Sequence, residues 1–468
     1  MFLQTKKFTL LPVILSAFIS TSVFASPSIY PTGVTRYDPI KAYNSYVLFA
    51  GSDKKTHLID LNGNEVHQWS YNGFPSLFLD PQLTGGKKGH VLVQLTGETG
   101  GRNNGESQSL GEVDWNNKVI WQWGGAKAQD AYANATTATD ASGYGTEIRQ
   151  HHDWRRLPNG NTLILINYVR PVTGFKAEKI LEDGIYELTP TNEVVWKWSA
   201  LEHLNEFGFS ESSLKLIKES LARNDKTAPF DYLHFNNMSV VGANKWFDAG
   251  DVRFHPDNIV VASREANFTA IIDKKSGKIV WHIGPDYEPS IGANKLPRPV
   301  DQISGQHDAH IIPKGLPGEG NLLVFDNQGA AGYPAAKLNT QPGSRVLEID
   351  PVKKEIVWQY TGASSGGPSY SFYSSYISSA RRLPNGNTLI DEGMTGRFIQ
   401  VTNKGEIVWE YVSPYFSKPK ADDPLAVSSN TVFRAQPVPY EWAPEGTPHS
   451  EKPVKAIDIT KFQVPAQK

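Results

Sequence analysis

The sequence predicts a six-bladed β-propeller whose ring is closed by strands from the N- and C-terminal parts of the chain. Two repeats and the overall composition support this fold class. The 468 residues include 40 glycines, 31 prolines and 12 tryptophans, which suits many short strands joined by tight turns. Hydrophobic residues make up 39% of the chain, enough to exclude disorder over most of its length.

A hairpin that ends in aromatic residues recurs six times and marks the blades. In each copy a strand ends in Asp or Thr, a polar turn follows, and a second short strand closes on aromatic residues, as in VDWNNKVIWQW. Equivalent positions are separated by 54, 75, 85, 77 and 51 residues, and long repeats with this hairpin content are typical of propeller blades. The copies lie at 59–69, 113–123, 188–198, 272–283, 349–360 and 401–411.

A second repeat places an inner strand before the hairpin. The ten residues RRLPNGNTLI occur at 155–164 and again at 381–390, and Pro-Asn-Gly-Asn forms a turn between two strands. Each blade therefore has four strands. The first blade lacks its own inner strand, and we expect residues 430–438 to supply it, so that no sheet edge stays exposed. A helix capped by Ser210 is expected at 210–223.

Alignment of the blades by their turns predicts a functional site at one mouth of the central channel. His152, His234 and His307 each begin an inner strand. Because inner strands surround the channel of a propeller, these side chains should converge although they are distant in sequence. The second strand of one blade ends at Arg264, beside His234, and Asn236 lies two residues beyond that histidine.

The chemistry of these residue types favours the binding of a tetrahedral oxyanion. Arginine presents a rigid fork to such oxygens. A neutral imidazole is a good nucleophile toward phosphorus or sulfur, and a second imidazole can transfer a proton. His151 should point to the opposite face of its strand, since side chains alternate along a strand. We interpret Asp153 and Asp308 as structural residues that orient turns or histidines.

Two further features lie near the predicted mouth. Asp326 and Glu392 occupy equivalent positions near the ends of second strands. The loop at 361–377 reads TGASSGGPSYSFYSSYI and is rich in aromatic residues. These rings can stack on an aromatic substrate, or the segment is an ordinary surface loop.

Composition also excludes several classes of function. The chain contains no cysteine, which excludes thiol catalysis, Cys-based zinc sites and disulfides. Its net charge is −2, so there is no basic excess for a nucleic-acid partner. Lys6 and Lys7 precede an apolar run at 8–19. This pattern predicts a signal peptide at 1–25 and a propeller domain at 26–468, located in the periplasm and free of the membrane after cleavage.

At the candidate site the chain resembles the bacterial aryl sulfate sulfotransferases, a family of six-bladed propellers exported to the periplasm. The resemblance extends over nearly all of the chain that follows the signal segment. It implies transfer of a sulfuryl group from a phenolic sulfate ester to another phenol, without the nucleotide sulfate donor PAPS. The motifs that carry it are QHD at 306–308, HFN at 234–236, SRE at 263–265, HHD at 151–153 and the IVW blade ends.

The resemblance also implies a role for each candidate residue. His307 matches the nucleophile, which becomes a transient sulfohistidine, and such covalent catalysis predicts ping-pong kinetics. Glu392 lies where the family has a polar, substrate-contacting residue at the rim, although Asp391 precedes it here. The groups that hold the sulfate oxygens and assist proton transfer are matched by Arg264, His152, His234 and Asn236.

Two other interpretations stay open. The segment KSGKIVW at 275–281 resembles the blade motif of quinoprotein dehydrogenases, whose propellers usually have eight blades and acidic calcium ligands. Alternatively, three histidines can ligate zinc or iron in a non-enzymatic exported propeller. The sulfotransferase interpretation requires no cofactor and no metal. Its partners are an aryl sulfate donor and a phenolic acceptor, both small molecules.

Overall fold

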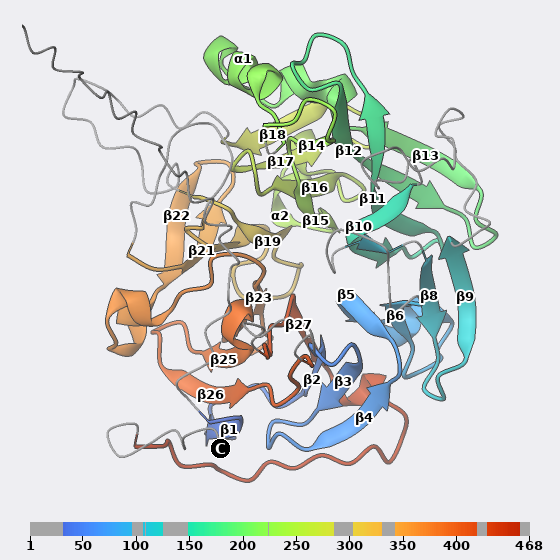
Figure 1. The fold of residues 1–468 in the computed structure, drawn as a ribbon. Helices are drawn as coiled ribbons and strands as arrows, with labels where there is room; N and C mark the ends of the chain where they lie inside the picture. The colour runs from blue at the N-terminus through green and yellow to red at the C-terminus, as the bar shows by residue number, and fades with distance from the viewer. Residues whose placement is uncertain are drawn as a thin grey trace, which may run out of the picture.

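Six antiparallel sheets lie around a central axis, and each sheet forms one blade (Figure 1). This computed structural model describes residues 31–95, 106–107, 109–124, 148–222, 224–284, 303–329, 342–418 and 428–458. The predicted six-bladed β-propeller is thereby confirmed. The expected signal peptide at 1–25 lies outside the described residues. Within the described ranges, none of the helices combines the length and apolar character needed to cross a bilayer.

The strands of each blade follow one another in chain order from the axis outward, except where a strand from elsewhere in the sequence joins a blade. The first blade, from inside to outside, comprises β27 (Ala435–Val438), β2 (Tyr46–Ala50), β3 (Thr56–Ile59) and β4 (Glu65–Trp69). The second comprises β5 (Asn72–Phe78), β6 (Val91–Gln94), β8 (Ser109–Val113) and β9 (Val119–Gly124). The third comprises β10 (Arg149–Arg156), β11 (Thr162–Pro171), β12 (Lys179–Leu188) and β13 (Val194–Ser199), with β7 (Glu106–Ser107) paired to β10 and β14 (Phe230–Asp231) paired to β12.

The remaining blades follow the same order. The fourth comprises β15 (Phe235–Val240), β16 (Ile259–Ser263), β17 (Phe268–Ile272) and β18 (Ile279–Ile283). The fifth comprises β19 (His307–Ile311), β20 (Leu322–Asp326), β21 (Arg345–Asp350) and β22 (Glu355–Tyr360). The sixth comprises β23 (Ser379–Arg382), β24 (Thr388–Glu392), β25 (Arg397–Val401), β26 (Ile407–Val412) and, outermost, β1 (Gly33–Tyr37).

Both ends of the described chain close the ring. β27 supplies the inner strand of the first blade, with Val438 opposite Tyr46 of β2, which confirms the expected role of residues 430–438. β1 adds an outer strand to the sixth blade, with Gly33 opposite Val412 of β26. Each of these two blades is therefore completed by a strand from a sequence-distant segment.

Tryptophan side chains fasten neighbouring blades to one another. In five of the six blades, an indole N–H at the end of the outer hairpin strand donates to a carbonyl in the outer turn of the next blade, at 2.7–3.0 Å. Because a buried indole N–H needs an acceptor, this contact fixes how each blade packs on the next. The pairs are Trp69–Asp114, Trp198–Gly277, Trp281–Pro351, Trp358–Asn403 and Trp409–Leu61.

The expected helix forms but is shorter than predicted. α1 spans Glu211–Glu219, and the Ser210 hydroxyl accepts the N–H of Ser213 as its N-cap. Ile217 is buried in the core of the third and fourth blades. The helix ends where Ser220 adopts an extended backbone, so residues 220–222 of the predicted segment are not helical.

Candidate active site

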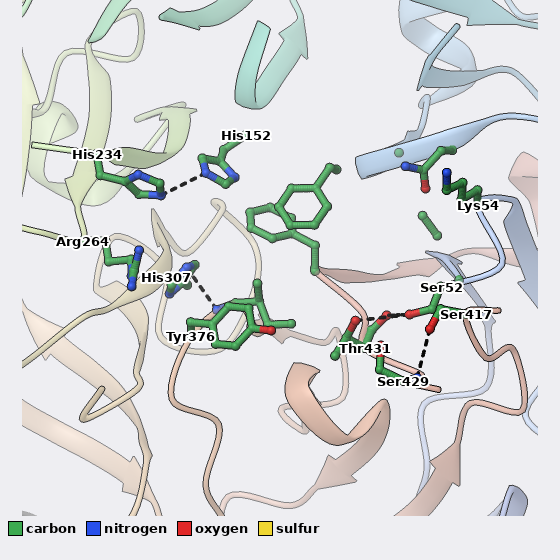
Figure 2. A pocket seen from close by; sticks show the side chains of 17 residues that line it. Ser52, Lys54, His152, His234, Arg264, His307, Tyr376, Ser417, Ser429 and Thr431 are labelled. Atoms are coloured by element: carbon green, nitrogen blue, oxygen red, sulfur yellow. Dashed lines mark hydrogen bonds between the residues drawn. The ribbon is translucent and has the colours of Figure 1, made fainter. Parts of the chain in front are cut away.

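A cavity of about 580 Å³ opens where the inner strands begin. Four of the six predicted site residues line it, namely His152, His234, Arg264 and His307. They come from the third, fourth and fifth blades and lie together at one side of the cavity (Figure 2). The structure thus gathers an arginine and three imidazoles from segments that are far apart in the sequence.

Two of the site histidines have a left-handed backbone, His152 within β10 and His234 directly before β15. His152 has φ 58° and His234 has φ 52°, a conformation that histidine adopts more readily than most residues. The pairing of β10 with β11 shifts register between Gln150 and Trp154. Because this bulge interrupts the alternation of side chains, the His151 ring lies 4.2 Å from the His152 ring and 5.0 Å from the His234 ring. The prediction that His151 faces away is therefore wrong.

The surroundings of His307 hold the ring in one tautomer. Its Nδ1 lies 2.8 Å from Asn327 Oδ1 and 3.0 Å from the carbonyl oxygen of Gly305. The Asn327 amide is itself fixed, because its Nδ2 donates to the carbonyls of Ser374 and Ile377 at 2.7 and 2.8 Å. Both neighbours of Nδ1 are therefore acceptors, so Nδ1 carries the proton and Nε2 carries the lone pair.

A backbone donor covers the lone pair of His307 in this structure. The N–H of Ile377 donates to Nε2 at 3.1 Å. Ile377 has φ 55° and Ser378 has φ 91°, and a left-handed conformation is strained for a β-branched residue. The end of this loop thus holds a donor against Nε2, and this hydrogen bond has to break before the Nε2 lone pair is available to a ligand.

Only one aromatic residue of the 361–377 loop lines the cavity. That residue is Tyr376. Phe372 is packed in the core at 1% exposure, whereas Tyr370 and Tyr373 are exposed. The suggestion that this loop offers several rings to a substrate is thus reduced to Tyr376.

Arg264 keeps hydrogen-bond donors available to the cavity. Its backbone N–H donates to the carbonyl of His234 at 3.1 Å, which places it beside that histidine as the strand count predicted. Its Nη1 lies 3.3 Å from a carboxylate oxygen of Glu265. Its Nε is buried and has no hydrogen-bond partner within the part of the chain that the structure describes. A guanidinium with a buried, unused donor beside an open cavity is suited to an anionic ligand.

His152 and His234 form a coupled pair. Their Nε2 atoms lie 3.1 Å apart, and His234 Nδ1 lies 2.7 Å from Asp231 Oδ2. Burial would lower the pKa of His234, but the charge and hydrogen bond of Asp231 outweigh burial and raise it. Burial, with the neighbouring His151 and His234, lowers the pKa of His152 well below its usual value. One proton can therefore be shared between the facing nitrogens at the edge of the cavity.

Two predicted substrate-binding residues lie outside the lining of the cavity. Asn236 is fully buried, and its Nδ2 donates to the carbonyl of Gln306 at 2.7 Å, which supports the backbone next to His307. Glu392 pairs with Arg397 at 2.9 Å and accepts the N–H of Tyr373 at 3.0 Å. In this structure both residues hold backbone segments and neither reaches the cavity.

Sequence reasoning missed the aromatic wall of the cavity. Phe74 and Phe433 stack with ring centroids 4.1 Å apart, and Phe433 also stacks on His152 at 5.3 Å. Both lie just before or within inner strands, in blades that contribute none of the candidate histidines. The position of Phe433 in the predicted inner strand at 430–438 indicates that this residue lies near the channel.

Hydroxyl groups line the part of the cavity opposite the histidines (Figure 2). Ser52 Oγ donates to the carbonyl of Thr431 at 2.9 Å, and the N–H of Ser429 donates to Ser417 Oγ at 3.0 Å. The cavity thus has one end that bears the arginine and the histidines, an aromatic middle, and a polar far end that also bears Lys54 (Figure 2).

Arg434 clamps the segments that carry two of the histidines. Its Nη1 and Nη2 donate to both carboxylate oxygens of Asp153 at 3.1 and 3.0 Å, and its Nε lies 3.0 Å from Asp308. Asp153 follows His152 and Asp308 follows His307 in the sequence. Burial would lower the pKa of Arg434, but the charges of Asp153 and Asp308 outweigh it and raise the pKa. The closing segment therefore ties the third and fifth blades together behind the cavity.

Replacing Arg434 with methionine is expected to lower the free energy of unfolding by about 2–3 kcal/mol, since it removes the partner that two buried carboxylates share. Asp153 keeps Arg155 and Asp308 keeps Arg381 as remaining partners. Chemical denaturation measures the change.

Arg253→Met is the matched control, because Arg253 pairs with Asp251 at the surface. This substitution should lower the free energy of unfolding by less than about 1 kcal/mol. Equal losses in the two variants would contradict the clamp.

Buried neutral histidines should make the protein sensitive to acid. Burial, with the charge of Arg264, lowers the pKa of His307 to about 3, and burial together with Arg381 lowers the pKa of His310. A depressed folded-state pKa contributes stability that is complete above the unfolded value of 6.5 and is lost as the pH falls toward the folded value. We expect the titration of His307 to lower the free energy of unfolding by about 1 kcal/mol for each pH unit below about 6.

Denaturant unfolding at a series of pH values measures this loss. The carboxylates of the protein contribute their own acid sensitivity, so the comparison is with His307→Gln, which lacks the titrating ring. The wild-type protein should lose stability more steeply than this variant as the pH falls below 6.5. Parallel curves would contradict a neutral, buried His307.

Comparison with protein-family models gives one match. The model described as Arylsulfotransferase (ASST) matches residues 130–419, a range that includes all six predicted site residues. No curated protein matches the chain.

Comparison with solved structures gives matches at low sequence identity and with TM-scores below 0.5. A protein of unknown function from Bacteroides caccae is 12% identical, with a TM-score of 0.43 over 85% of this chain and 99% of its own. Quinohemoprotein alcohol dehydrogenase from Comamonas testosteroni is 13% identical, with a TM-score of 0.36 over 79% of this chain and 58% of its own. AztD from Citrobacter koseri, in its apo form, is 10% identical, with a TM-score of 0.35 over 84% of this chain and 98% of its own. Likeness at this level carries no argument about function.

Proposed function

The chain belongs to the arylsulfotransferase (ASST) family, and from this premise we propose that it moves a sulfuryl group from a phenolic sulfate ester to a phenolic acceptor through a sulfohistidine at His307. One observation carries the proposal. His307 is neutral, holds its lone pair on Nε2, and lines a cavity that it shares with Arg264 and two further imidazoles. The aromatic wall of Phe74 and Phe433 suits the ring of a phenol.

In the first half-reaction Nε2 of His307 attacks the sulfur of the aryl sulfate. The bond between sulfur and the aryl oxygen breaks, and its electron pair leaves on the phenolate oxygen. The His152–His234 pair carries one positive charge, with a proton on each Nδ1 and one proton between the Nε2 atoms. That last proton then passes to the phenolate oxygen, which releases a phenol and leaves two neutral imidazoles. Arg264 holds the sulfuryl oxygens, where its free Nε can bind the charge that develops during transfer.

The environment of His307 stabilises the intermediate. Once Nε2 is bonded to sulfur, the ring carries a positive charge. The Nδ1–H then donates to Asn327 Oδ1 and to the carbonyl of Gly305, both already in place. The N–H of Ile377, displaced from Nε2, becomes available as a further donor to the sulfuryl oxygens.

The second half-reaction reverses the first. The acceptor phenol loses its proton to the His152–His234 pair, and its oxygen attacks the sulfur as the nitrogen–sulfur bond breaks. The electron pair of that bond returns to Nε2, and the enzyme is restored. This sequence needs no PAPS, because the aryl ester is itself the sulfuryl donor. The basic start and the apolar run at 8–19 support a periplasmic location as part of the proposal.

The quinoprotein interpretation finds less support in the cavity. Among the described residues, those that line the cavity include neither aspartate nor glutamate. A calcium ion beside a quinone would need acidic oxygen ligands.

Incubation with 4-nitrophenyl sulfate and phenol tests the proposed function. We expect 4-nitrophenol and phenyl sulfate to appear in equal amounts, and initial rates at varied donor and acceptor concentrations to give parallel double-reciprocal lines. Intersecting lines would contradict a covalent intermediate. Absence of nitrophenol release at high enzyme concentration, with a panel of phenolic acceptors, would contradict the proposed activity itself.

A further inference from the structure

Three imidazoles of the third and fourth blades form a cluster that does not include His307. One ring nitrogen of each of His151, His152 and His234 lies within 4.8 Å of the others. All three side chains are buried. Their ring centroids are 4.2, 4.9 and 5.0 Å apart. His152 and His234 also line the cavity, so the cluster borders open space.

Carboxylates orient two of the three rings in the manner of metal ligands. Asp183 Oδ1 lies 2.9 Å from His151 Nδ1, and Asp231 Oδ2 lies 2.7 Å from His234 Nδ1. Asp183 is held in turn by the N–H of Phe235, which donates to its other oxygen at 2.9 Å. A carboxylate on the far nitrogen fixes the tautomer, leaves the lone pair on Nε2 and makes an imidazole a better ligand.

We propose that His151, His152 and His234 bind a divalent transition metal such as zinc, with a fourth coordination position open to the cavity. Zinc–nitrogen bonds of about 2.0–2.1 Å place tetrahedral ligands about 3.3 Å apart. The Nε2 atoms of His152 and His234 are already 3.1 Å apart, so His151 has the largest shift to make. Three nitrogen donors suit zinc and its neighbours and disfavour magnesium and calcium.

The local charges and protons permit this binding. Two carboxylates lie behind the ligands, the buried Asp183 and the partly exposed Asp231. They outnumber the single guanidinium of Arg264, which lines the same cavity. The proton held between the two Nε2 atoms is released to solvent when the metal binds, because imidazole ligands bind metals with a free lone pair. His152 keeps its own proton on Nδ1, which is buried and has no hydrogen-bond partner in the described part of the chain.

Metal binding at this cluster would inhibit sulfuryl transfer. This part of the inference rests on the proposed function, in which His152 and His234 share the transferred proton. A metal ion on their Nε2 atoms removes that proton carrier and occupies space beside His307.

Titration of the chelator-treated chain, without a polyhistidine tag, with zinc chloride and with cobalt chloride tests the proposal. We expect one equivalent of zinc by calorimetry and the intense visible bands of tetrahedral cobalt. His151→Asn should weaken zinc binding by at least about 100-fold, and Asp231→Asn by about 10- to 100-fold. His255→Asn, at a partly exposed histidine outside the cluster, is the matched control and should bind as the wild type does.

Several outcomes would overturn the proposal. These are no saturable binding, a pale octahedral cobalt spectrum, or zinc affinity that is unchanged in His151→Asn. The cobalt spectrum of the wild-type chain decides the question even if a variant fails to fold. Transferase activity of the metal-free chain is measured separately, so its absence would contradict the proposed function and leave the metal result standing.

Discussion

His307→Ala is expected to abolish sulfuryl transfer, with a loss in kcat of at least about 10⁴-fold, since removal of a nucleophile usually removes almost all chemistry. The reason is geometric as well as chemical. His307 is held in the tautomer that leaves Nε2 free of a proton, by the fixed amide of Asn327 and the carbonyl of Gly305. The release of 4-nitrophenol from 4-nitrophenyl sulfate measures the loss.

His310→Ala is the matched control for this prediction. His310 lies on the same strand, β19, and is also buried, but it does not line the cavity, and its Nδ1 lies 2.8 Å from the carbonyl of Asp308. The control should lose stability and keep most of its kcat. Comparable loss of kcat in the two variants, both folded by circular dichroism, would show that the strand and not the His307 nitrogen is required.

Arg264→Met should lower kcat by about 10²–10³-fold, the usual effect of removing a donor that stabilises developing charge. The fold should survive, because the side chain of Arg264 is 30% exposed and pairs only with Glu265 among the described residues. Arg264→Lys keeps the charge but lacks the planar fork, so it should recover only part of the rate.

Steady-state kinetics with the control Arg253→Met checks this prediction. Arg253 pairs with Asp251 away from the cavity, so its loss should leave kcat unchanged. An Arg264→Met variant that raises KM and keeps kcat would contradict transition-state stabilisation, because it would show that Arg264 binds the donor and the transition state equally well.

The repeats made the architecture and the main site residues predictable. Once the hairpins and the RRLPNGNTLI turns were aligned, the starts of the inner strands followed from counting, and with them the positions of His152, His234 and His307. The same counting placed Arg264 beside His234, as its backbone hydrogen bond shows. Periodic features of a propeller are local in sequence, so the sequence records them directly.

The remaining features depend on departures from regular geometry. The left-handed backbone at His152 breaks the strand alternation and brings His151 into the histidine cluster, which no alternation rule can foresee. Asn236 and Glu392 align with the site residues, but their side chains are held by Gln306 and Arg397. The direction in which such a side chain points depends on its rotamer and on the hydrogen-bond partners that the folded chain places beside it.

The closing segment carried the most information that sequence reasoning did not use. Residues 430–438 had been assigned to an inner strand, yet Phe433 and Arg434 were not considered as site residues. Phe433 faces the cavity, whereas Arg434 binds Asp153 and Asp308 behind it. Arg434 is a charged residue in a strand that is expected to line the axis. Because buried charges require partners, its position indicates a buried ion pair near the site.

The most direct test of the central claim is to locate the sulfuryl group on the enzyme. The wild-type chain is mixed with 4-nitrophenyl sulfate in the absence of acceptor, quenched under mildly alkaline conditions and mapped by peptide mass spectrometry. We predict one added sulfuryl group on the peptide that contains His307, and its disappearance when phenol is added before the quench. A sulfuryl group on His152 or His234, or full transfer activity with no modified peptide, would contradict the account.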